Sequence, residues 1–230
     1  DKNARFALLP RIGQPILWDF GSAAKHHQMY APWLPPENFR GGVSPMRGAM
    51  PDHTGVPDRL ASHILEELRE HGLENDPVGI DMTDMVALAA LNRAGIATTD
   101  CSQVMLAART IKTDEEVALL DHAAAIVDAT YERIYEMLRP GVKESEVVAD
   151  AQKLLFELGS EQVEAINAVS GDRCIPHPHV FSDRLLRPGD QAFFDIIQSF
   201  MGYRTCYYRT FAVGGTNQAQ IDAYTQCREW

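Results

Sequence analysis

At residues 184–215 the chain reads RLLRPGDQAFFDIIQSFMGYRTCYYRTFAVGG. Two apolar runs within it, DQAFFDIIQSF and YRTCYYRTFAVGG, are rich in β-branched and aromatic residues, a composition that favours strands. Glycines mark the turns around these runs. An earlier run, VEAINAVSG at residues 163–171, has the same character. The sequence therefore predicts a sheet formed by these three segments.

Two helices are expected directly before these strands. The first starts at Thr113, where TDEE has the form of a capping box, because the Thr113 hydroxyl can accept the Glu116 amide and the Glu116 carboxylate can reach back. The second runs from about Glu144 to Gly159. We expect an antiparallel helix pair, and helices followed by a sheet predict an α+β domain. The apolar stripe of the first helix comprises Val117, Leu120, Ala124, Val127, Tyr131, Ile134 and Leu138.

A separate, smaller α/β lobe is predicted for the first 100 residues, where short apolar runs alternate with Pro and Gly. Residues 31–57 are dense in Pro and Gly and lack periodicity, so we expect a surface excursion or a lid over a site. The boundary is placed so that the two domains span residues 1–101 and 102–230. The predicted strands lie at 6–9, 16–18 and 77–82, and the predicted helices around Leu60, Ile64 and Leu68 and at 85–93.

Charge and composition narrow the classes of function. The formal net charge of -11 opposes nonspecific binding to nucleic acid or anionic lipid, because both have the same sign as the protein. No apolar stretch approaches the roughly 18–20 residues of a membrane span, and the start lacks the pattern of a signal peptide. The four scattered cysteines predict free thiols. We expect a cytoplasmic protein that binds neither nucleic acid nor membrane.

Two segments resemble a known enzyme family. Residues 109–147, RTIKTDEEVALLDHAAAIVDATYERIYEMLRPGVKESEV, are similar to the start of the catalytic domain of aminopeptidase P, prolidase and creatinase, with the order R-x-x-K, helix, P-G, E-x-E. Residues 184–215 resemble that family's L-x-x-G-D-x-x-x-x-D-x-G, G-Y and D-x-T-R-T-F signature. The resemblance implies a pita-bread catalytic domain at 102–230, preceded by part of a small α/β creatinase-type N-terminal domain at 1–101. Family members have more sequence on both sides, so we expect a fragment of a longer chain.

The resemblance also implies a metal site, in which two carboxylates from adjacent strands, then a histidine and two glutamates, hold two divalent metals around a hydroxide. Asp195 falls on the first aspartate of that set, but Cys206 stands where the second belongs. A thiolate is a softer ligand than a carboxylate. Three explanations stay open: one altered metal with Cys206 as ligand, no metal, or a degenerate non-catalytic domain. The candidate cations are Mn, Fe, Co or Zn, and a metal-free protein is the alternative.

Further site residues follow from the same resemblance. His177 and His179 lie close to where the family places a histidine that contacts substrate and can transfer a proton, and we favour His179. Tyr208 and Arg209 are candidates for binding a substrate carboxylate or lining the pocket, although an arginine on a strand often only pairs with a nearby acid.

The leading hypothesis is a hydrolase of the Xaa-Pro aminopeptidase or prolidase type, acting on a small C–N bonded substrate, either a small molecule or a short peptide. The alternatives are a metal-independent creatinase-like amidinohydrolase, a dimethylsulfoniopropionate C–S lyase and a non-catalytic binding domain. Resemblance to the family also implies a homodimer whose partner contributes to the site. The loop at 31–57 is the candidate for that contribution.

Overall fold

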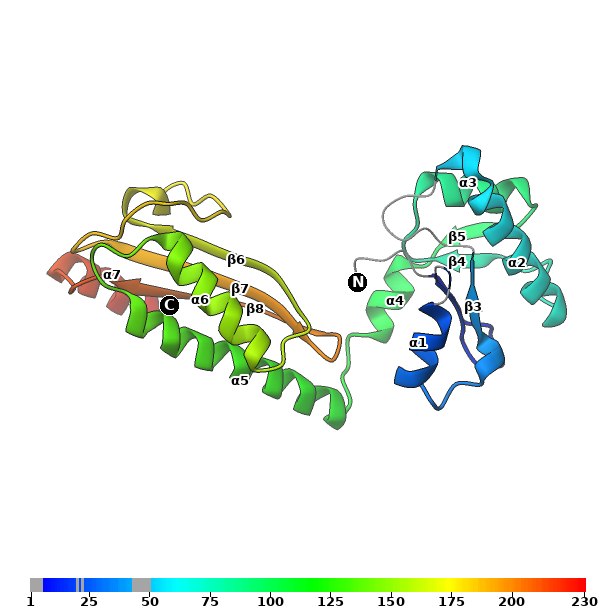
Figure 1. Ribbon diagram of the computed structural model, residues 1–230, viewed down its shortest axis with the longest axis horizontal. Helices are drawn as coiled ribbons and strands as arrows, with labels where there is room; N and C mark the ends of the chain where they lie inside the picture. The colour runs from blue at the N-terminus through cyan, green and yellow to red at the C-terminus, as the bar shows by residue number, and fades with distance from the viewer. Residues whose placement is uncertain (1–5, 20, 22, 43–50) are drawn as a thin grey trace. The chain divides into compact units, whose positions relative to one another are not determined.

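The protein is described by a computed structural model that covers residues 6–19, 21, 23–42 and 51–230. The chain divides into two compact units, Asp1–Ile111 and Lys112–Trp230 (Figure 1). The boundary expected at 101/102 lies earlier in the chain than this observed division. Residues after 101 stay with the first unit, and one contact that holds them there is the hydrogen bond from the Ser102 hydroxyl to the carbonyl oxygen of Asp81, at 3.2 Å.

The first unit contains two small sheets with helices around them. In one sheet β2 pairs antiparallel with β1 and parallel with β3, and in the other β4 and β5 are parallel. Its strands are β1 (Phe6–Leu8), β2 (Ile16–Asp19), β3 (Phe39–Gly41), β4 (Val78–Ile80) and β5 (Thr98–Asp100). Its helices are α1 (Ala23–Tyr30), α2 (Val56–Glu70), α3 (Met85–Arg93) and α4 (Ser102–Ala108), with 3-10 turns η1 (Pro36–Asn38) and η2 (Asp52–Thr54).

Most of the local predictions for this unit are confirmed. Leu60, Ile64 and Leu68 form the buried face of α2, and α3 spans Met85–Arg93 as expected. The segment 31–57 is not all loop, because β3 lies within it and pairs with β2; residues 43–50 of that segment lie outside the described residues. Helices α1 and α4 were not predicted. Each is short and buries at most one residue, so neither leaves an apolar stripe in the sequence.

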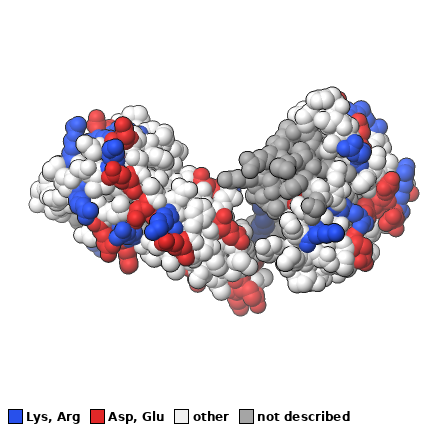
Figure 2. All heavy atoms as spheres, in the orientation of Figure 1, with Lys and Arg blue, Asp and Glu red and all other residues white. Residues whose placement is uncertain are grey.

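The second unit is a helix pair packed on an antiparallel sheet. The sheet has the order β6-β7-β8, and α5 and α6 cover one of its faces, lying side by side in Figure 1. Charged side chains of both signs are interspersed on the face drawn in Figure 2. The elements are α5 (Asp114–Met137), α6 (Glu144–Glu157), β6 (Gln162–Ser170), the 3-10 turn η3 (Gly171–Cys174), β7 (Gln191–Phe200), β8 (Tyr203–Ala212) and α7 (Gln218–Glu229).

Helix α5 starts as the sequence predicts. The Glu116 amide donates to Thr113 Oγ1 at 3.3 Å and the Thr113 amide donates to Glu116 Oε2 at 2.7 Å, which completes the capping box. Val127 and Ile134 are fully buried, whereas Val117 at the start of the predicted stripe is 45% exposed. The helix therefore packs on the sheet mainly through its later turns.

The pleat of β7 separates two kinds of residue. Phe194 and Ile196 point to the helices and lie in the hydrophobic core with Leu155 of α6. Because successive side chains of a strand point to opposite faces, the residues between them point away from the helices. We call this second side the open face, defined by Phe193, Asp195 and Ile197 of β7 with Cys206 and Tyr208 of β8.

Among the described residues, no helix combines the length and apolarity needed to cross a lipid bilayer.

Candidate functional site

The Asp195 carboxylate is the most buried acid on the open face, with 3% of the residue exposed. The amide Nδ2 of Asn167 donates to Asp195 Oδ2 at 2.9 Å. On the other side, Cys206 Sγ lies 3.4 Å from Asp195 Oδ1 and donates to it. A buried carboxylate is costly unless it is hydrogen-bonded or paired. Both oxygens of Asp195 have a partner, and each partner comes from a neighbouring strand.

Strand register brings these groups together. Asn167 of β6 and Tyr208 of β8 lie directly opposite Asp195, one on each side. Cys206 pairs with Ile197, so it is the diagonal neighbour of Asp195 on the same face. Opposite and diagonal residues of antiparallel strands are within side-chain reach of each other. The site is therefore built by the pairing of three strands, the hairpin β7–β8 and the strand β6, which precedes it along the chain.

Burial and the Asp195 carboxylate together raise the pKa of two neighbouring groups. Burial raises the pKa of the Cys206 thiol above its usual value, and the hydrogen bond to Asp195 raises it further. The negative charge of Asp195 is also the main reason that the pKa of Tyr208 is raised. At neutral pH both groups therefore keep their protons. In this state Cys206 acts as a hydrogen-bond donor to Asp195 rather than as a thiolate.

A row of rings continues the open face away from Asp195. The rings of Phe193 and Tyr208 are stacked with centroids 5.3 Å apart, and the His177 ring lies 4.9 Å from Phe193. His179 follows at 4.6 Å from His177. The structure thus brings both predicted histidines and Tyr208 to one continuous surface with the Asp195 group. In such a row the ring faces can contact apolar parts of a small ligand, and the imidazole nitrogens and the phenol hydroxyl can form hydrogen bonds with its polar parts.

Arg209 lies elsewhere. Its guanidinium stands over the ring of Tyr207 at 4.9 Å and lies 3.8 Å from a carboxylate oxygen of Asp128 on α5. Alternation along β8 explains this, because Arg209 and Tyr208 are consecutive and must point to opposite faces. The expectation that Arg209 binds substrate beside Tyr208 finds no support in this placement. The arginine instead pairs with a nearby acid on the helix side.

The donors for a metal ion form only a partial set. Within the part of the chain that the structure describes, no group of three or more His, Cys, Asp or Glu side chains could hold a metal. Asp195 and Cys206 are two neighbouring side chains that can coordinate a metal ion, one through a carboxylate and one through a thiol. The chemistry of this pair suits one cation that tolerates sulfur, such as zinc or iron, and does not reproduce a set of two carboxylates.

Asn167 is a site residue that the sequence reasoning missed. A signal was present, because an amide side chain in the middle of the apolar run VEAINAVSG must find a hydrogen-bond partner if it is buried. What the run could not reveal is that the partner is Asp195, which lies 28 residues away in the chain.

Comparison with solved structures defines the class of fold. The chain superimposes on the dipeptidase from Pyrococcus horikoshii with a TM-score of 0.72 at 22% identity, covering 98% of this chain and 58% of the other. It superimposes on the Xaa-Pro dipeptidase from Bacillus anthracis with a TM-score of 0.71 at 24% identity, covering 96% and 58%. At these identities the likeness establishes the fold. The second unit has the α+β architecture of the pita-bread fold class.

Sequence comparison defines the family. Residues 118–230 match the sequence model of metallopeptidase family M24. The chain is also 30% identical over 225 residues to "Probable dipeptidase PepE" of Mycobacterium tuberculosis, a match that covers 97% of this chain and 54% of that protein. Residues 118–230 are therefore a metallopeptidase family M24 region, and the predicted resemblance to the aminopeptidase P and prolidase family is confirmed. Those curated relatives match almost all of this chain, but the chain spans only about half of their length.

Proposed function

We propose that this chain supplies part of the active site of a peptidase-type hydrolase that cleaves short peptides of the Xaa-Pro kind. The observation that carries the proposal is the buried Asp195 carboxylate on the open face, hydrogen-bonded to Asn167 and Cys206 and continued by the histidine and aromatic row. Relatives named as dipeptidases support the choice of substrate class. Those names also favour a peptidase over the amidinohydrolase, lyase and binding-domain alternatives.

Asp195 and Cys206 are the residues that would hold a divalent cation. A bound cation of this kind activates water and stabilises a developing oxyanion. Cys206 would lose its proton on binding, so uptake would release a proton and would weaken as the pH falls. The mixed carboxylate–thiol pair favours zinc or iron over manganese.

The rings on the open face would bind the substrate. We assign to His177 or His179 the transfer of a proton to or from the scissile amide, because both rings belong to the row on the open face, which Phe193 links to Tyr208. The stacked rings of Phe193 and Tyr208 offer a flat apolar surface for a side chain or a proline ring. A homodimer, a contribution of residues 31–57 to a partner's site and a cytoplasmic location stay predictions.

The test combines metal content with activity. We expect the protein, expressed at its full natural length, to carry zinc or iron by elemental mass spectrometry and to hydrolyse Xaa-Pro dipeptides. Changing Cys206→Asp should shift the preferred cation toward manganese or cobalt, since it replaces sulfur with a hard oxygen ligand. Cys227→Asp, a change at an exposed cysteine of α7, is the matched control and should alter neither quantity.

Two results would contradict the proposal. Metal content that is identical in the wild type and in Cys206→Asp would remove Cys206 from the site. Absence of Xaa-Pro hydrolysis with each of manganese, cobalt, zinc and iron supplied would exclude the proposed activity.

A further inference from the structure

The Glu144 carboxylate is buried at the start of α6, with 1% of the residue exposed. Its Oε1 accepts a hydrogen bond from the Ser170 hydroxyl at 2.6 Å. Its Oε2 accepts hydrogen bonds from the Ser182 amide at 2.9 Å and the Ser182 hydroxyl at 2.8 Å, and it pairs with the Arg173 guanidinium. A buried charge with this many donors is held in one position, because each donor would be left unpaired if the carboxylate moved.

These donors come from both ends of one loop. Ser170 and Arg173 precede the segment 174–181, and Ser182 follows it. Arg173 reinforces the closure, because its two terminal nitrogens donate to the Ser182 hydroxyl at 2.7 Å and to the carbonyl oxygen of Val180 at 2.8 Å. We call segment 174–181 the histidine loop, since it contains His177 and His179. Its base is closed on a single carboxylate.

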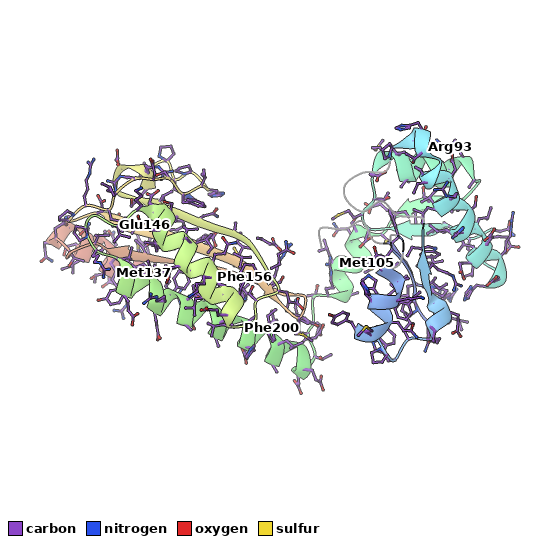
Figure 3. The ribbon with its side chains drawn as sticks, viewed as in Figure 1. Arg93, Met105, Met137, Glu146, Phe156 and Phe200 are labelled. Carbon is purple, nitrogen blue, oxygen red and sulfur yellow. The ribbon has the colours of Figure 1, made fainter. Side chains whose placement is uncertain are left out.

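The backbone of α6 supports the same closure. The first amides of a helix have no partner within it. Here the Glu144 amide donates to the carbonyl oxygen of Arg184 at 3.1 Å and the Ser145 amide donates to that of Ser182 at 3.0 Å. Glu146, on the same turn, is exposed and only caps the helix. Figure 3 labels it at the end of α6 opposite to Phe156.

A second ion pair ties the loop base to the strand that carries Asp195. Arg184 Nη1 donates to Asp190 at 2.5 Å and to the Ser170 hydroxyl at 2.9 Å, and Asp190 directly precedes β7. Burial alone would raise the pKa of Asp190, but the hydrogen bonds from Arg184 and the Arg187 amide outweigh it and lower that pKa. Through Ser170 the two acids share one network.

We propose that Glu144 is a positioning residue that fixes the histidine loop over the open face. The loop reaches that face where His177 contacts Phe193. Ordering a loop of this length costs conformational entropy. The hydrogen bonds to Glu144 hold the two ends of the loop together and so reduce the number of conformations open to it. An effect of Glu144 on catalysis rests on the proposed peptidase function, whereas its effect on the position of the histidine loop does not.

Nuclear magnetic resonance of the full chain tests the positioning directly. The ring protons of His177 should show shifts caused by the Phe193 ring, assigned by their loss in His177→Gln. We expect these signals in Glu144→Gln to move toward their unfolded positions and broaden. The exposed Glu146→Gln, which removes a charge from the same turn, should leave them unchanged. If the proposed function holds, Glu144→Gln should also lower kcat for an Xaa-Pro dipeptide by at least about tenfold.

A second variant keeps the test decisive if Glu144→Gln does not fold. Ser182→Ala removes one hydroxyl donor and should displace the same His177 signals by a smaller amount. Unchanged His177 signals in a folded Glu144→Gln or Ser182→Ala protein would overturn the inference. Displaced signals in a protein that cleaves no Xaa-Pro peptide would sustain the positioning role and reject the proposed function.

Discussion

Gly171 begins the turn between β6 and the histidine loop, and two features restrict this position to glycine. Its φ is +58°, in the left-handed region that costs other residues about 1–2 kcal/mol. An added Cβ would also lie 2.6 Å from a carboxylate oxygen of Asp190 and against the Arg184 guanidinium. That guanidinium cannot simply swing aside, because Asp190 and Ser170 hold it. The ion pair and the turn therefore depend on each other.

We expect Gly171→Ala to lower the free energy of unfolding by about 2–4 kcal/mol, as the sum of backbone strain and a clash. Gly202→Ala is the matched control in the same unit. Its φ is +82° and no atom lies within 4 Å of an added Cβ, so Gly202→Ala should cost only the backbone strain, about 1–2 kcal/mol. Urea denaturation measures both. Equal losses in the two variants would show that Arg184 and Asp190 move away freely.

At the level of the element, the first turn of α5 is held from two sides. Glu116 accepts the Thr113 amide within the capping box and the Tyr203 hydroxyl, at 2.9 Å, from the start of β8. The Thr113 amide, and then Tyr203, lower the pKa of the Glu116 carboxyl below its ordinary value of 4.5. The folded state therefore favours the ionised carboxylate, and this contribution to stability exists above pH 4.5.

The corresponding prediction concerns acid. Glu116→Gln keeps the shape of the cap but removes the charge, so its Tm should lie below that of the wild type at pH 7. The difference should shrink as the pH falls below about 4.5, because the unfolded state then takes up the proton more readily than the folded state. Glu132→Gln, at an exposed position in the later part of α5, controls for the loss of one charge. A Tm difference that is the same at pH 3 and pH 7 would contradict this account.

For the whole molecule, the relevant feature is that most buried apolar residues in the described part of the chain fall into two clusters with no member in common. One includes Leu155 of α6, which is fully buried, and the other includes Leu60 of α2, which is 2% exposed. Each cluster lies within one of the two compact units. Since each unit has its own core, each has its own source of stability.

We expect calorimetry to resolve two thermal transitions. Leu155→Ala should lower one of them and Leu60→Ala the other, each by the equivalent of about 2–5 kcal/mol from lost burial and the cavity left behind. Each variant serves as the control for the other. A single transition that both substitutions lower equally would show that the two units unfold together.

The local sequence determined most of the second unit. The capping box at Thr113, the three- and four-residue spacing of α5 and α6, and the three β-type runs predict elements whose bounds agree with the structure within a few residues. Asp195 is singled out through the family resemblance, which a local anomaly supports, since a carboxylate in an apolar strand is costly unless it is paired. Such signals are readable because periodicity and caps depend only on neighbouring residues.

Only the tertiary structure decided what surrounds Asp195. That Asn167 and Cys206 bind it, that Tyr208 faces the site and Arg209 does not, and that Glu144 closes the histidine loop all depend on strand register and on contacts between distant segments. A strand's own pattern tells which residues share a face, but not which neighbour pairs with them. The helices α1 and α4 were missed because they bury almost nothing and so leave no pattern to read.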